Sequence, residues 1–191
     1  MQSILRPAFV LLFVFSAVTG MLYPLAVTGT VQAAFPWQAA GSLVLRDGQP
    51  AGSMLIGQNF SDPRDFWGRP SATAPVPYNG TASGGANQGS LHPALIDAVK
   101  ARVAALRAAD PGNTAPVPID LVTASASGLD PHISPAAARY QVPRVARLRG
   151  LQPAQVEQLV AQYTQTPLWG LLGEPRVNVL ALNLALSHSK S

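Results

Sequence analysis

The residues best suited to chemistry lie in one short segment, Asp130-Pro-His-Ile-Ser134. Aspartate, histidine and serine make a hydrolytic triad, but triad members normally come from separate segments that converge in space. The chain also lacks a G-x-S-x-G elbow on which Ser83, Ser125 or Ser127 could act as a nucleophile. We therefore interpret the segment as an Asp-Pro turn before a serine-capped helix, and as an interaction surface. A membrane-anchored periplasmic hydrolase that uses Ser83 or this segment is the alternative.

Metal and nucleotide sites have little support in the sequence. His92, His132 and His188 are far apart and lack the i, i+4 spacing of a metal site. The absence of cysteine excludes disulfides, thiolate catalysis and iron–sulfur clusters. Gly84–Gly89 does not match G-x-G-x-x-G, and no G-x-x-x-x-G-K-[ST] motif is present. We expect no catalytic residue, no metal and no directly bound cofactor.

Arginines supply the main basic cluster of the chain, at positions 139, 144, 147 and 149. Arg144 and Arg147 would share one face of a helix. The 13 basic and 9 acidic residues give a net charge of +4, which is too weak for a dedicated nucleic-acid binder. A solvated face is the default interpretation, and contact with acidic protein surfaces or anionic lipid headgroups is the alternative.

The elements that position these residues begin with a long apolar segment. No charged side chain lies between Arg6 and Arg46, and residues 8–27 are uncharged and mostly apolar. As a helix they would span about 30 Å, the thickness of a bilayer's hydrocarbon core. Val31-Gln32-Ala33 resembles a signal-peptide cleavage site, but the apolar run is longer than the usual ~7–15 residues of a signal peptide. A retained transmembrane helix at 8–28 is therefore favoured.

Arg6, on the short side of this helix, predicts a cytoplasmic N-terminus and an exported remainder. Ser16, Thr19 and Gly20 form a small patch that is suited to helix packing in the membrane. The chain is thus divided into a cytoplasmic N-terminus (1–7), a transmembrane helix (8–28), a juxtamembrane linker (29–40) and a periplasmic domain (41–191).

Residues 60–92 are rich in proline, glycine and small polar residues, yet they contain Phe66, Trp67, Arg69 and Tyr78. Disordered linkers usually lack such aromatics. We therefore expect a long, irregular but ordered loop, and long ordered loops are often functional.

Helical periodicity is clearest from Pro93 to Asp110. Ser134 and Pro135 are suited to begin a second, short helix, and Pro143 a third that Gly150 ends. Pro153 opens a fourth helical pattern.

Strands are expected on both sides of Asp47-Gly48, a type I′ hairpin signal, over residues 42–46 and 51–58. Residues 117–125 read as a short buried strand. In residues 177–186 the alternating leucines favour a strand, although a helix also fits. The expected fold class is α+β: one N-terminal transmembrane helix followed by a single mixed α/β extracytoplasmic domain.

Several blocks of the sequence resemble the C subunit of the bacterial Kdp potassium-transporting ATPase, the KdpC family. Among them are LDPHIS with VPRVA, inside residues 118–150, and GEPRVN, inside residues 170–186. The blocks GSMLIGQNFSDPRDFWGRPSAT (52–73) and YNGTASGG (78–85) add to the resemblance. Together with the N-terminal span, the resemblance covers nearly the whole chain.

This resemblance implies an accessory subunit of a complex that imports K⁺ at the expense of ATP. Its partners would be a P-type catalytic subunit, a channel-like potassium-binding subunit and membrane lipid, with no nucleic acid. ATP and K⁺ would be handled by the complex, and this subunit would stabilise it and raise the ATP affinity of the catalytic subunit. The sequence has no Asp-Lys-Thr-Gly or Thr-Val-Gly-Tyr-Gly motif, which agrees with an accessory role.

Polar and aromatic residues on the expected loops and helix starts are the candidates for partner contact. They are Phe66, Trp67, Arg69, Asp130, His132, Arg144 and Arg147.

Overall fold

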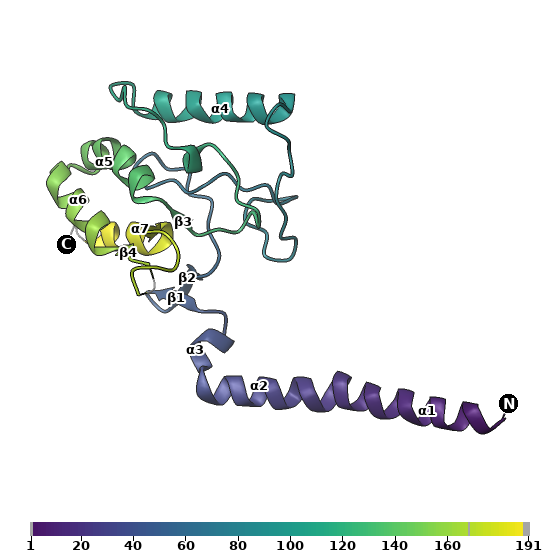
Figure 1. Ribbon diagram of the computed structural model, residues 1–191. Coiled ribbons are helices and arrows are strands. Elements are labelled where there is room, and N and C mark those ends of the chain that lie inside the picture. The colour runs from purple at the N-terminus through teal and green to yellow at the C-terminus, as the bar shows by residue number, and fades with distance from the viewer. Residues whose placement is uncertain (1, 168, 189–191) are drawn as a thin grey trace. The chain divides into compact units, whose positions relative to one another are not determined.

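The computed structural model describes residues 2–167 and 169–188, and it divides the chain into two compact units. The N-terminal unit is Met1–Ala51 and the C-terminal unit is Gly52–Ser191. The structure is mixed α/β, with one long apolar helix near the N-terminus (Figure 1).

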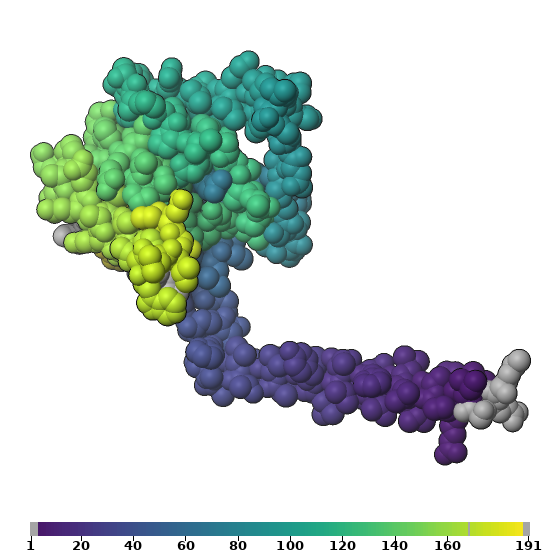
Figure 2. Space-filling view, viewed as in Figure 1, coloured from purple at the N-terminus to yellow at the C-terminus, as the bar shows by residue number. Residues whose placement is uncertain are grey.

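The N-terminal unit is dominated by one continuous helix. It consists of α1 (Gln2–Ala17), a π-helical stretch (Val18–Leu22) and α2 (Tyr23–Ala34). Within the helix Ile4–Ala34 an 18-residue window reaches a mean hydropathy of 2.1, and this helix is long and apolar enough to cross a membrane. Figure 2 shows the helix as a rod, and its large apolar side chains are exposed. The helix that the sequence predicts is therefore present, but it extends beyond 8–28 at both ends.

Pro24 gives a physical reason for the π-helical stretch. A proline inside a helix has no N–H to donate, and its ring clashes with the carbonyl four residues earlier. The wider turn of Val18–Leu22, which includes that carbonyl on Gly20, relieves the clash. Within the segment expected as a linker, residues 29–34 are helical and Pro36–Ala39 form the short helix α3.

The Asp47-Gly48 hairpin is confirmed. It joins β1 (Leu43–Arg46) to β2 (Gln49–Ser53), and Asp47 (φ 52°) and Gly48 (φ 77°) both have the positive φ of a type I′ turn. The second strand begins two residues earlier than expected and ends at Ser53 rather than at residue 58.

The C-terminal unit contains a small antiparallel sheet. Its strands are β3 (His132–Ile133), β4 (Thr164–Gln165) and β5 (Arg176–Asn178), in the order β3-β5-β4. Val177 pairs with Ile133 on one side and Thr164 on the other. Helix α5 (Pro135–Arg149) packs against α6 (Pro153–Gln162), and α6 packs against α7 (Val179–His188).

Two predicted helices begin and end as their caps indicate. Helix α4 (Pro93–Ala109) starts after His92, whose Nδ1 accepts from the N–H of Ala94 at 3.2 Å. Helix α5 starts after Ser134, whose Oγ accepts from the N–H of Ala137 at 3.0 Å. Gly150 (φ 68°) ends α5 in the left-handed conformation. The third helix expected at Pro143 is wrong, because α5 continues through this proline.

Two strand predictions are wrong. Residues 117–125 contain a 3₁₀ turn, Ile119–Leu121, in place of a strand. In residues 177–186 the strand ends at Asn178, whose Oδ1 accepts from the N–H of Ala181 at 3.1 Å and so caps α7. The apolar residues after it then form one buried helical face, which includes Val179, Leu182 and Leu186.

The long loop at 60–92 is ordered and irregular, as expected, and its aromatic part lies in the core. Two buried amides hold it. Asn183 on α7 accepts from the N–H of Phe66 at 2.8 Å and donates to its carbonyl at 3.0 Å. Gln141 on α5 does the same for Trp67, at 2.8 and 3.1 Å. Each amide satisfies a donor and an acceptor of the backbone, as a neighbouring strand would. We call these two contacts the amide clamps.

Truncating an amide clamp should destabilise the C-terminal unit. Asn183→Ala leaves the N–H and carbonyl of buried Phe66 without partners, and each such group costs about 1–3 kcal/mol. Denaturant titration of the full chain in detergent measures the decrease in the free energy of unfolding. The exposed Gln158→Ala on α6 is the control. Equal stability of the two variants would show that the clamp contributes nothing.

Candidate functional site

Three of the seven candidate contact residues are buried. Phe66 is fully buried, Trp67 is 7% exposed and Arg144 is 2% exposed. Two guanidinium groups lie near the indole of Trp67, with Arg144 at 4.6 Å and Arg102 at 5.3 Å from the ring centroid. Phe66, Trp67 and Arg144 therefore belong to the core and hold the loop in place, and their contact with a partner stays a prediction.

Arg144 is a buried cation with mostly neutral partners. It donates to the carbonyls of Pro63 and Asp65, the latter at 3.0 Å, and to Oε1 of Gln141 at 2.7 Å. Burial lowers the pKa of Arg144 to about 10. Carbonyl dipoles and the face of Trp67 thus replace the water that its charge would otherwise require.

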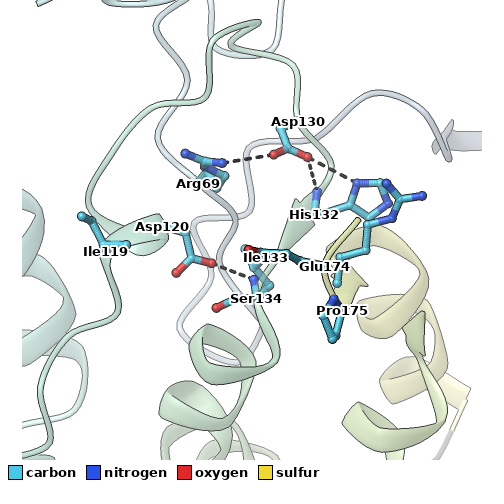
Figure 3. Close-up of a pocket in the computed structure, with 10 residues that line it drawn as sticks. Arg69, Ile119, Asp120, Asp130, His132, Ile133, Ser134, Glu174 and Pro175 are labelled. Atoms are coloured by element: carbon cyan, nitrogen blue, oxygen red, sulfur yellow. Dashed lines mark hydrogen bonds and ion pairs between the residues drawn. The ribbon is translucent and has the colours of Figure 1, made fainter. Parts of the chain in front are cut away.

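Arg69, Asp130 and His132 come together at the surface of the C-terminal unit. Nη1 of Arg69 lies 3.3 Å from Oδ2 of Asp130. Oδ1 of the same carboxylate accepts from the N–H of His132 at 3.0 Å and lies 3.3 Å from its Nδ1. Figure 3 shows Asp130 between the arginine and the histidine. Their side chains are 20–29% exposed, so a partner molecule can reach them.

The backbone holds Arg69 in this position. Its Nε and Nη2 donate to the carbonyls of Thr123 and Ala124, at 3.4 and 3.2 Å. The hydroxyl of Tyr78 donates to the carbonyl of Arg69 at 2.5 Å. The 60–92 loop and the segment before Asp130 are therefore joined at this point, although they are about fifty residues apart in sequence.

These residues line one side of an open cavity of about 410 Å³, which we call the polar pocket. Asp120 lies on a second side and accepts from the N–H of Ser134 at 2.7 Å. Glu174 and Arg176, from the segment leading into β5, line a third. The polar pocket presents both charge signs and is suited to hydrogen-bonding a polar peptide segment. No group of metal ligands occurs among the residues that the structure describes.

The local charges shift the pKa of Asp130. Burial by itself would raise it, but the hydrogen bonds from the ring and N–H of His132, and the charges of His132 and Arg69, outweigh burial. The pKa of Asp130 consequently lies below its usual value.

Arg147 lies apart from the polar pocket. Its Nη1 is 2.6 Å from Oδ1 of Asp110, at the C-terminal end of α4. Asp110 is buried, whereas the side chain of Arg147 is about half exposed. This pair ties α5 to the end of α4 and leaves part of the guanidinium available to a partner.

The serines considered for hydrolysis have structural partners. Oγ of Ser83 donates to the carbonyl of Ser127 at 3.1 Å, which joins two loops. Oγ of Ser134 caps α5. The hydrogen bond described for the ring of His132 goes to Asp130. No observation here favours the hydrolase alternative.

The membrane-packing candidates Ser16, Thr19 and Gly20 lie on exposed helix surface. Thr19 Oγ1 donates to the carbonyl of Phe15 at 2.7 Å, which satisfies its hydroxyl within the helix. A Cβ at Gly20 would meet nothing within 4 Å, so a partner helix has room to approach. Packing of these residues on a partner stays a prediction.

Sequence reasoning did not select Asp120, Glu174 or Arg176. Asp120 lay within a segment expected to be a strand, and the other two precede the apolar tail. The quoted GEPRVN block was the available signal, since it places Glu174 just before β5 and Arg176 at its first position.

The lowered pKa of Asp130 predicts an acid-dependent loss of stability. Its ionised form stabilises the fold above the unfolded pKa of ~3.9, and this contribution is lost as pH falls through the lower folded pKa. Asp130→Asn should lower the melting temperature of the full chain at neutral pH, and the difference should shrink below about pH 4. Asp47→Asn, at an exposed carboxylate, is the control. A difference that stays constant down to about pH 3 would contradict this assignment.

The chain is similar to known potassium-transport proteins over almost its whole length. The family model described as "KdpC: K+-transporting ATPase, c chain" matches residues 5–188. A protein of Variovorax paradoxus (strain S110), named potassium-transporting ATPase KdpC subunit, is 71% identical over 189 residues, which cover 99% of this chain and 98% of that protein.

Two further proteins with the same name come from other bacteria. That of Polaromonas naphthalenivorans (strain CJ2) is 70% identical over 190 residues, 100% of this chain and 97% of its own length. That of Sorangium cellulosum (strain So ce56) is 64% identical over the full length of both chains. A family match over residues 5–188 and identities this high leave one conclusion: the chain belongs to the KdpC family, the c chains of K⁺-transporting ATPases.

Proposed function

We propose that this chain is the accessory subunit of an ATP-driven potassium import complex in a bacterial inner membrane. The single observation that carries the proposal is the family match over residues 5–188, which includes the apolar helix and the polar pocket. Its partners are the P-type catalytic subunit and the channel-like potassium-binding subunit of that complex. The chain contributes assembly and stability, while ATP and K⁺ are handled by the partners.

The proposed topology follows from charge and length. The 31-residue apolar helix Ile4–Ala34 would measure about 46 Å at ~1.5 Å per residue, more than a hydrocarbon core requires. Arg6 supplies the positive charge that favours retention of the N-terminus in the cytoplasm. The C-terminal unit is then periplasmic, on the side opposite to ATP.

This topology constrains how the subunit can raise the ATP affinity of its partner. A periplasmic unit cannot touch a nucleotide in the cytoplasm. Any effect on ATP binding must therefore pass through the helix, as a difference in its contacts with two conformations of the pump. The room beside Gly20 and the adjacent Ser16 and Thr19 make this stretch the contact that we assign to the partner helices.

The polar pocket is the contact that we assign to the periplasmic side of the complex. Arg69, Asp130 and His132 are held rigidly by the backbone, so little conformational entropy is lost when a partner binds them. Both signs of charge are present, which favours a partner segment with a complementary pattern. Arg147 offers a second, separate contact.

Removing the cation of the polar pocket should weaken assembly. We expect the Arg69→Ala variant to co-purify with the two partner subunits in a smaller amount. The substitution removes a guanidinium group that is held in place and would donate hydrogen bonds to the partner. Arg176→Ala, which also changes the lining of the polar pocket, should act in the same direction. Native gels and tagged co-purification of the complex measure the effect.

The matched control is Arg64→Ala. Arg64 is exposed, pairs with Asp62 and lies outside the polar pocket. Each variant is also compared by thermal unfolding, so that misfolding is recognised. If Arg69→Ala and Arg176→Ala both assemble as well as Arg64→Ala does, the polar pocket is not the contact.

Exchanging the helix should separate anchoring from the effect on ATP. When residues 8–28 are replaced by a polyleucine helix, we expect the complex to need more ATP for half-maximal activity, because the specific helix contacts are lost. The chain should stay in the membrane, since hydrophobic length is kept.

Two measurements accompany this exchange. ATPase activity of the purified complex gives the KM for ATP, and added protease on right-side-out vesicles reports the topology. Protection of residues 30–191 from protease would overturn the topology, and an unchanged KM with the exchanged helix would overturn coupling through the helix.

A further inference from the structure

The loop between β4 and β5 carries a group of exposed apolar side chains that the polar pocket does not use. Trp169 is 82% exposed, Leu171 is 85% exposed and Leu172 is 59% exposed. We call these three residues the apolar tip. Other large exposed apolar residues of the C-terminal unit, such as Val76, Leu91 and Ile119, are separated in sequence, whereas the apolar tip has three within four positions. Concentrated exposure of this kind marks an interaction surface.

The backbone of the loop supports a role outside the fold. Trp169 has a φ of 53°, a conformation that is costly for a bulky residue, and the next residue, Gly170, also has positive φ (74°). The N–H of Gly170 donates to the carbonyl of Pro167 at 3.0 Å, which closes the turn. Strained positions of this kind cluster where a protein binds something. Here the strained turn directs an indole into water and away from the core.

We infer that the apolar tip inserts into the interfacial region of the lipid bilayer that holds the apolar helix. The inference rests on the membrane anchoring in the proposed function. Tryptophan is the side chain that best suits this interface, because its ring is apolar and its N–H can bond to headgroups and water. Leucine adds apolar surface beneath it. The sequence from Thr164 to Gly173 carries no charge, so insertion desolvates no ion.

The connection to the membrane helix keeps lipid within reach of the apolar tip. Residues 35–51 separate the end of α2 from Gly52, and a segment of this length spans at most about 60 Å. The chain enters the C-terminal unit beside β5, since Nδ2 of Asn178 donates to the carbonyl of Met54 at 2.9 Å. The apolar tip leads directly into β5 at Arg176. The tether joins the same unit that carries the apolar tip, and it makes contact of the tip with lipid intramolecular.

The test uses the complete absence of cysteine in this chain. Leu171→Cys introduces a unique thiol at the apolar tip for an environment-sensitive fluorophore. The labelled full-length chain is reconstituted in liposomes, alone and with its partner subunits. We expect the emission of the label to be blue-shifted relative to the same fluorophore in water. We also expect its fluorescence to be quenched when brominated phospholipid is included. Ala108→Cys, exposed on α4, is the control and should show neither effect.

Each outcome decides the inference. A label at Leu171→Cys that behaves like the one at Ala108→Cys overturns it. A blue shift that appears only with the partner subunits, without quenching by brominated lipid, overturns it in favour of a protein groove. Carbonate extraction of the same vesicles separates this failure from that of the proposed function. Release of the chain by carbonate overturns anchoring and the inference together, whereas a carbonate-resistant chain with a water-exposed label overturns the inference alone.

Discussion

The C-terminal unit depends on how it satisfies the backbone of an irregular loop that runs through its core. Phe66 and Trp67 bring their N–H and carbonyl groups into the interior, where no strand among the described residues pairs with them. The amide clamps from Asn183 and Gln141 meet this requirement. A buried amide can do this because it carries a donor and an acceptor at the spacing of a peptide group. The loop can then be irregular in outline and still be as ordered as a strand.

The amide clamps also explain why a charge is tolerated in this core. Gln141 gives its oxygen to both Trp67 and Arg144, so the guanidinium and the loop share one acceptor. Arg144 and Arg102 both lie over the indole ring, and Arg102 also donates to the carbonyl of Gly68 at 3.1 Å. The next residue is Arg69. The position of the polar pocket is therefore fixed by contacts that begin in the core and end at its rim.

Sequence patterns within a few residues correctly predicted those elements whose ends depend on turn and capping residues. Asp47-Gly48 has the φ preference of its turn, and Ser134 and Gly150 cap the helix between them. The prediction failed where tertiary contacts outweigh local preference. Pro143 does not end α5, because its neighbours Val142 and Val145 are buried on both sides of it. The burial of Arg144 could not be predicted for the same reason, since it depends on residues more than seventy positions away in the sequence.

The segment that leads from β4 to β5 contributes to both the polar pocket and the apolar tip. Glu174 and Arg176 line the pocket, and the apolar tip lies directly before them, separated by Gly173. Antiparallel pairing of β5 with β3 and β4 fixes the base of this loop, so the two surfaces cannot move independently by more than the turn allows. Contact of the apolar tip with lipid therefore limits the orientations in which the polar pocket meets a partner. A restricted search of this kind lowers the entropic cost of assembly without adding a contact. This reduction in entropic cost matters most for a subunit with a single membrane helix. Such a helix alone does not restrict rotation of the subunit about the membrane normal.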